Sequence, residues 1–191
     1  MQSGGPSWEV EAGRKDSRTA SLQGANTNLP APTSGVATLV QKFRNVGLSA
    51  KDMVALSGAH TIGKARCTSF SARLSGAVGA ASKDLTFLQS LQQLCSVSAG
   101  SALAHLDLAT PARFDNLYFK NVLAGRGLLS SDEVLLTKSA ETAALVKAYA
   151  DDVDLFFRHF AQSMVRMGNI SPLTGAQGEI RKNCRRLNSD H

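Results

Sequence analysis

The strongest pattern in the sequence is an apolar stripe near its C-terminal end, and a glycine at position 168 follows it. The stripe consists of Val153, Phe156, Phe157, Phe160, Ala161, Met164 and Val165. These residues recur every three or four positions, which is the period at which side chains share one face of an α-helix. The stripe therefore predicts a long amphipathic helix that ends at Gly168.

Weaker helical patterns fill much of the remaining chain. They predict helices over residues 36–46, 50–57, 65–74, 85–95 and 140–149. Thr33 or Ser34 is the expected cap of the first helix, and Ser49 with Asp52 resembles a capping box at the start of the second. Strand patterns are nearly absent, apart from a short strand pair expected around Trp8. The predicted fold class is therefore all-α, with little β structure and long connections.

Length and composition set the scale of the fold. A chain of 191 residues corresponds to one domain of roughly 150 residues, or to one domain with an extension, and 43% hydrophobic residues can build a core. Residues 1–32 are rich in Gly, Pro, Ser and Asn and lack a helical period, so an irregular segment is predicted there. The helical domain is predicted over residues 33–191, with a linker of small residues at 75–81.

The charge distribution argues against a specific nucleic-acid partner. The chain carries 21 basic and 15 acidic side chains, but the basic residues gather near its two ends and only 6% of the residues are aromatic. Bases would therefore find few side chains on which to stack. No apolar run is long enough to predict a membrane helix, and the first residues lack the basic and apolar regions of a secretory signal peptide.

His60 is the most suggestive of the four histidines. It directly follows a predicted helix end, and Gly58 and Gly63 on either side suit a backbone that passes close to a bulky group. Two interpretations stay open: a histidine that packs in the core or caps a helix, and a metal ligand. Zinc-finger spacing and a C-x-x-C-H motif are both missing, so a metal here would need an axial arrangement, as in non-covalently bound haem.

Residues 107–116 are rich in side-chain oxygens. Asp107, Thr110 and Asp115 lie close together in this segment, and Asn116 follows them. Their oxygens suit a calcium ion, which takes six to eight oxygen ligands. They equally suit an Asx turn that caps a helix.

Three other features have only local interpretations. Asp132 is expected to be the N-cap of the segment that follows it. Pro30 and Pro32 fix the path of a loop. The three cysteines are an odd number, so at least one thiol has no partner within this chain.

The segment 52–67, DMVALSGAHTIGKARC, resembles the haem-ligand signature of the secretory (class III) plant peroxidases. Other motifs resemble the same family in the same order along the chain. They are GGPSW at 4–8, GRKDS at 13–17, NLPAP at 28–32, FRNVG at 43–47, TPARFDN at 110–116, GLLSSD at 127–132, MGNISPLTG at 167–175 and GEIRKNC at 178–184. The motifs span essentially the whole chain, which is therefore identified as a member of this family.

The resemblance implies the proximal domain of a haem peroxidase, with haem b and calcium as cofactors. His60 is similar to the axial ligand of the haem iron, and Asp132 to the carboxylate that accepts the proton of its other ring nitrogen. The implied calcium ligands are the side chains of Thr61, Asp107, Thr110 and Asp115 and the carbonyl of Arg113.

The resemblance also assigns roles outside these two sites. Cys67 and Cys95 match a family disulfide, which is expected to stabilise the fold by roughly 3–4 kcal/mol. Pro30 matches a proline beside the aromatic-donor site, so residues 1–32 are expected to border that site, and Arg66 matches a contact to a haem propionate. Cys184 is expected to be unpaired, because it resembles a cysteine whose partner lies in a part of the family's chain that these 191 residues do not contain.

The activity that the resemblance implies is the oxidation of small phenolic donors by hydrogen peroxide, with roles in hydrogen peroxide breakdown and in the response to oxidative stress. A monomer is expected, secreted to the cell wall or held in the vacuole. The distal His and Arg of the family have no counterpart here, so impaired activity is expected. The alternative is a non-catalytic, truncated protein that binds haem or calcium, or an incomplete gene model.

Overall fold

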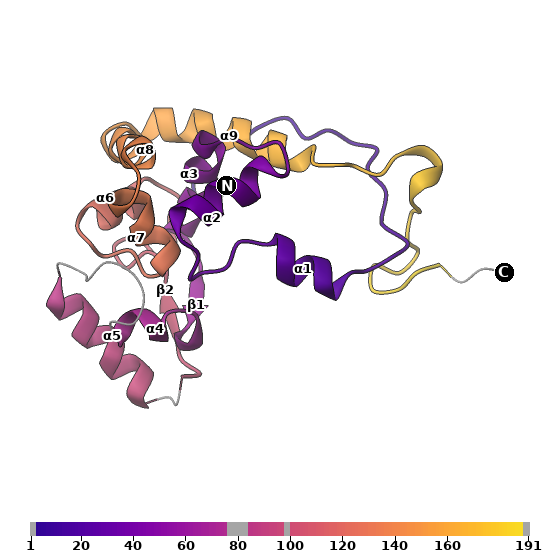
Figure 1. Cartoon of the computed structure of the whole chain (residues 1–191). Helices are drawn as coiled ribbons and strands as arrows, with labels where there is room; N and C mark the ends of the chain where they lie inside the picture. The colour runs from indigo at the N-terminus through magenta and orange to yellow at the C-terminus, as the bar shows by residue number, and fades with distance from the viewer. Residues whose placement is uncertain (1–2, 76–83, 98–99, 189–191) are drawn as a thin grey trace.

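A computed structural model describes residues 3–75, 84–97 and 100–188, and most of them are helical, as predicted (Figure 1). The α-helices are α1 (Leu22–Asn28), α2 (Val36–Arg44), α3 (Ala50–Ser57), α4 (Ser71–Leu74), α5 (Leu85–Val97), α6 (Leu117–Leu123), α7 (Ser130–Thr137), α8 (Ala140–Asp151) and α9 (Val153–Gly168). The remaining elements are the strands β1 (Lys64–Arg66) and β2 (Leu103–His105) and the 3-10 turns η1 (Gly58–Thr61), η2 (Cys67–Ser69) and η3 (Gly175–Gln177). Across the described residues, no helix is both long enough and apolar enough to cross a membrane.

The main core lies between α3, α6, α8 and α9. Figure 1 shows α9 across the top of the molecule, with α3 and α8 beside it. Phe156 and Phe160 of the predicted stripe are buried in this core, and the ring of Phe156 packs against Phe119 of α6 and Tyr149 of α8. The predicted long amphipathic helix is thus confirmed.

A smaller second core surrounds the disulfide between Cys67 and Cys95. It contains Phe70, Phe87 and Leu91 and lies below the main core in the view of Figure 1, where α4, α5, β1 and β2 gather. The prediction of one helix over residues 65–74 is wrong for its first half. Residues 64–66 instead pair antiparallel with 103–105, and the disulfide holds the next turn against α5, so these long-range ties override local helical propensity.

The start of α3 is fixed by the predicted capping box. The Ser49 hydroxyl accepts the backbone N–H of Asp52 at 3.1 Å, and Asp52 Oδ2 accepts the backbone N–H of Ser49 at 2.9 Å. The other oxygen of Asp52 accepts hydrogen bonds from Ser163 and Arg166 of α9, each at 2.8 Å. Asp52 therefore both begins α3 and joins it to α9.

The N-terminal segment runs beside the C-terminal segment, and α1 stands apart from the main core (Figure 1). An isolated bridge pairs Asp16 with Glu179. The strand pair expected around Trp8 is not formed in the described residues; the indole packs edge-on against Phe160 instead, with ring centroids 6.0 Å apart. Two smaller predictions concern a helix cap and a linker. Helix α2 has Gly35 as its N-cap rather than the expected Thr33 or Ser34. The expected linker at 75–81 lies, apart from its first residue, outside the described residues.

We expect Asp52→Asn to lower the free energy of unfolding by about 2–3 kcal/mol at pH 7. Burial raises the pKa of Asp52, but hydrogen bonds from Ser49, Ser163 and Arg166 outweigh burial and lower the pKa from 3.8 to about 2. Because the folded-state pKa is lowered, the stabilisation is complete above pH 3.8 and is lost as the pH falls toward 2. Urea unfolding of both proteins across this pH range measures the effect.

The matched control is Asp154→Asn, which changes an exposed acid in the first turn of α9. This control should stay within about 0.5 kcal/mol of the parent chain. A difference between the parent chain and Asp52→Asn that is equally large at pH 7 and near pH 2 would contradict the account, since it would not depend on the charge of Asp52.

Candidate functional site

His60 lies in the 3-10 turn η1, which continues α3 without a break. A Cβ atom on Gly58 would overlap the ring of Phe156 and would lie 2.9 Å from the ring of Phe119. At Gly58 the backbone thus passes close to two bulky rings. Gly63, on the other side, has a φ angle of 98°, a conformation that side chains disfavour.

The imidazole of His60 is hydrogen-bonded to the carboxylate of Asp132, with Nδ1 at 2.9 Å from Oδ1. Asp132 is 1% exposed and accepts two more hydrogen bonds, from the Tyr118 hydroxyl at 2.9 Å and from the backbone N–H of Leu129 at 2.8 Å. Because the carboxylate acts as an acceptor in this network, the neutral imidazole carries its proton on Nδ1. The lone pair of Nε2 is therefore free to bind a metal.

Asp132 is the third residue of α7 rather than its N-cap, so the sequence prediction for its position is wrong. The helix begins at Ser130, and Leu129 is its N-cap. Asp132 Oδ2 reaches back to the N-cap N–H, in the manner of the third residue of a capping box, while Oδ1 faces His60. One side chain thus caps the start of the helix and orients the histidine.

The same pair changes the proton affinity of the histidine. Burial lowers the pKa of His60, but the charge of Asp132 and the hydrogen bond to it outweigh burial, so the pKa is raised above its ordinary value of 6.5. The pKa rises because the carboxylate stabilises the protonated, positively charged ring. The hydrogen bond from Nδ1–H to a carboxylate also raises the basicity of Nε2 as a metal ligand.

A cavity of about 310 Å³ opens beside His60, at the lower end of the range of roughly 300–1,000 Å³ that is typical of ligand pockets. Apolar side chains from α2, α3 and the segment before α2 form most of its wall. They include Pro30, Pro32, Leu39, Phe43, Met53 and Leu56. The structure therefore brings Pro30 and His60, two of the predicted site residues, to one cavity.

The oxygens that were predicted to bind calcium gather around Thr61. The Thr61 hydroxyl oxygen lies 3.4 Å from each of three oxygens, namely Asp107 Oδ2, Asp115 Oδ1 and the carbonyl of Arg113. Thr110 Oγ1 lies 3.2 Å from the same Asp115 oxygen. One hydroxyl proton cannot satisfy three acceptors, and these separations exceed the roughly 2.7–2.8 Å of a good O–H···O hydrogen bond.

The spacing of these oxygens fits a hard cation. Two oxygens that bind one calcium ion at about 2.4 Å and at a right angle lie about 3.4 Å apart. Thr61 and Asp107 are both 0% exposed, and the Asn121 amide donates to Asp107 Oδ1 at 2.9 Å. Within the described residues, no three His, Cys, Asp or Glu side chains come together as a metal-binding group. This cluster has two carboxylates, and hydroxyl and carbonyl oxygens supply the rest of the donor set.

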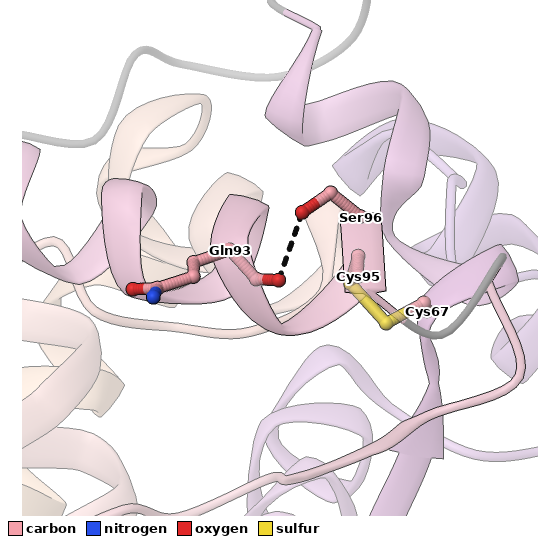
Figure 2. Close-up of a disulfide and its surroundings, with 4 residues drawn as sticks. All are labelled: Cys67, Gln93, Cys95 and Ser96. Atoms are coloured by element: carbon pink, nitrogen blue, oxygen red, sulfur yellow. Dashed lines mark hydrogen bonds between the residues drawn. A yellow bond between two sulfur atoms is a disulfide. The ribbon is translucent and has the colours of Figure 1, made fainter.

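The disulfide between Cys67 and Cys95 is confirmed. Figure 2 shows the bond at the end of α5, and the two Cα atoms are 5.7 Å apart. Cys184 is exposed and has no disulfide partner among the described residues. Arg66 is exposed on β1 and does not line the cavity beside His60, so its contact with a haem propionate stays a prediction.

Three buried groups near Asp132, namely Tyr118, Arg73 and Glu133, were not predicted from the sequence. Arg73 and Glu133 form a buried ion pair, with Nη2 at 3.5 Å from Oε1 and side chains only 1% and 3% exposed. Tyr118 lies in α6, whose apolar helical period over residues 117–123 would have revealed both the helix and its buried face. The ion pair carries no sequence signal, because its members come from α4 and α7.

A histidine whose Nδ1–H is held by a buried carboxylate, beside a mostly apolar cavity, is an arrangement common among metal-ligating histidines. Comparison with known proteins gives the family.

Residues 1–152 match the family model described as Peroxidase. The chain is 57% identical over 192 residues to Peroxidase 9 of Arabidopsis thaliana, 51% over 191 residues to Peroxidase 15 of Ipomoea batatas and 50% over 188 residues to Peroxidase 4 of Vitis vinifera. Each match covers 97% of this chain. The chain therefore belongs to the plant peroxidase family, as its motifs predicted.

The chain spans about half the length of the curated relatives it matches. The three matches cover 56%, 58% and 57% of those relatives. The site described above thus lies in a region that this chain shares with each of them.

The close packing at Gly58 gives a test of how η1 is positioned. We expect Gly58→Ala to lower the free energy of unfolding by about 1–3 kcal/mol, because the added methyl group must displace the rings of Phe156 and Phe119. Urea unfolding measures the loss. Gly168→Ala is the matched control, since nothing lies within 4 Å of a Cβ atom added there. Equal stability of the two variants would show that η1 is not packed as described.

Proposed function

We propose that this chain holds the haem of a peroxidase, with His60 as the axial ligand of the iron, and that the peroxidase oxidises small phenolic donors with hydrogen peroxide. Haem, when bound, supplies the redox chemistry of peroxide reduction and donor oxidation. Membership of the peroxidase family supports the proposal. The observation that carries it is the hydrogen bond from His60 to the buried Asp132, beside a mostly apolar cavity.

The residues of this chain bind and orient the ligand histidine. Asp132 accepts a hydrogen bond from the Nδ1–H of His60, which fixes the ring and leaves Nε2 as the donor to iron. Leu39 and Phe43 give the cavity apolar walls beside the histidine. We assign Pro30, on the same wall, to the edge of the donor site, and Arg66 to a haem propionate.

Calcium is the second proposed cofactor. Its ligands are the side chains of Thr61, Asp107, Thr110 and Asp115 and the carbonyl of Arg113. The distance of 3.4 Å from the Thr61 hydroxyl oxygen to each of three other oxygens supports this assignment. Because Thr61 directly follows the haem-ligand histidine, the ion would hold the end of η1 in place.

The same proposal covers the domain organisation of the chain and its location. Residues 33–191 form the helical haem-binding domain, and residues 1–32 border the donor site. The Cys67–Cys95 disulfide supports a location in an oxidising compartment, which fits secretion to the cell wall or delivery to the vacuole. A monomer that oxidises donors after reducing peroxide would contribute to hydrogen peroxide breakdown and to the response to oxidative stress.

The proposal is tested by loading the 191-residue chain with hemin in the presence of calcium. We expect a Soret band typical of histidine-ligated haem, and we expect His60→Ala to lose that band because it removes the Nε2 donor. His159→Ala is the control, since it removes a histidine that does not line the cavity. A Soret band that is unchanged in His60→Ala would contradict the proposal.

The loaded chain also serves to measure turnover with guaiacol and hydrogen peroxide. Among the described residues that line the cavity, His60 is the one histidine, and its proposed role is that of ligand rather than acid or base. General acid–base catalysis contributes about 10²–10⁴-fold, so we expect turnover slower by that factor than in a relative of full length. Equal rates would overturn this expectation, whereas haem binding without any turnover would favour the alternative of a non-catalytic haem-binding protein.

Calcium binding has a separate readout in thermal stability. We expect a chelator to lower the melting temperature of the parent chain, because calcium binds the folded state alone. Thr61→Val removes the central hydroxyl and should abolish most of that calcium-dependent shift. Thr142→Val is the matched control, since its hydroxyl is also buried but pairs with Leu135 and Ser139 carbonyls. A chelator effect of equal size in parent and Thr61→Val would place any bound calcium elsewhere.

A further inference from the structure

Tyr118 touches both members of the histidine–carboxylate pair. Its hydroxyl donates to Asp132 Oδ1 at 2.9 Å, the same oxygen that His60 Nδ1 approaches at 2.9 Å. Its ring lies edge-on to the imidazole of His60, with centroids 5.9 Å apart. Tyr118 is 1% exposed, so water does not compete for these contacts.

The hydroxyl of Tyr118 acts as a fixed donor. Burial and the nearby charge of Asp132 raise the pKa of Tyr118 well above its ordinary value of 10.0, so the phenol keeps its proton. Two donors, Tyr118 and His60, therefore share one carboxylate oxygen. Each hydrogen bond draws electron density from that oxygen and weakens the attraction it offers to the other donor.

The geometry points to Tyr118 as a positioning residue that limits the strength of the His60–Asp132 hydrogen bond, and we infer that it thereby limits how strongly His60 donates to the haem iron. This inference rests on the proposed function, in which His60 is the iron ligand. The tyrosine acts through Asp132 and the histidine, not by touching a substrate.

Replacing the hydroxyl alone isolates the effect. In Tyr118→Phe the ring keeps its edge-on contacts with His60 and Phe119, and Asp132 keeps its second anchor, the Leu129 N–H at 2.8 Å from Oδ2. The matched control is Tyr149→Phe. Tyr149 is equally buried in the main core, but its hydroxyl pairs with His159 Nδ1 at 2.9 Å rather than with Asp132.

The test compares the hemin-loaded parent chain, Tyr118→Phe and Tyr149→Phe by two readouts other than activity. These are the iron–histidine stretching frequency of the ferrous state, from resonance Raman spectra, and the one-electron reduction potential of the iron. Without the competing donor, Asp132 should attract the Nδ1 proton more strongly, so His60 becomes a stronger donor. We expect a higher stretching frequency and a more negative potential in Tyr118→Phe alone, with 59 mV for each tenfold gain in preference for ferric iron.

The outcomes separate this inference from the proposed function. If the parent chain shows an iron–histidine stretch and Tyr118→Phe matches Tyr149→Phe in both readouts, or shifts in the opposite direction, the inference is overturned and the proposed function stands. If the parent shows no iron–histidine stretch, the proposed function fails and the inference fails with it.

A second substitution keeps the test open if Tyr118→Phe does not fold. Fluorotyrosine at position 118 keeps the shape of the side chain and makes its hydroxyl a stronger donor to Asp132. It should shift both readouts in the direction opposite to that expected for Tyr118→Phe, namely to a lower stretching frequency and a more positive potential. Readouts equal to those of the parent chain would overturn the inference.

Discussion

The hydrogen bond between His60 Nδ1 and Asp132 Oδ1 joins two segments that lie 72 residues apart in the sequence. It forms only if η1 and α7 meet at one edge of the main core, so it requires most of the fold to be in place. Asp132 is only 1% exposed, and burying a carboxylate costs free energy unless hydrogen-bond donors replace the lost water. The imidazole, the Tyr118 hydroxyl and the Leu129 N–H are those donors.

Each side of this bond has its own support. On the histidine side, the Ser49–Asp52 capping box begins α3, and Asp52 joins α3 to α9, so η1 extends from a helix that is held at its start. The absence of a side chain at Gly58 lets that turn lie against Phe156. On the carboxylate side, the second core packs against the connection that leads into α7. The main core therefore supports the histidine, and the second core supports the carboxylate.

Much of this could be predicted from the sequence. Helical periodicity located α2, α3, α5, α8 and α9, because each of these helices has an apolar face long enough to show its period. Periodicity failed over residues 65–74, where a disulfide and a strand pairing set the backbone. Motifs supplied His60 and Asp132, but their resemblance carries no distances, so the sharing of one carboxylate oxygen with Tyr118 required the structure.

The proposed function depends on Asp132 orienting His60 with the proton on Nδ1 and a free Nε2. Long-range proton–nitrogen correlation spectra of the histidine rings, recorded on the ¹⁵N-labelled chain where imidazoles are neutral, report this tautomer directly. We expect His60 to carry its proton on Nδ1 in the parent chain. A His60 ring protonated on Nε2 would contradict this expectation, because that nitrogen would then have no lone pair for a metal.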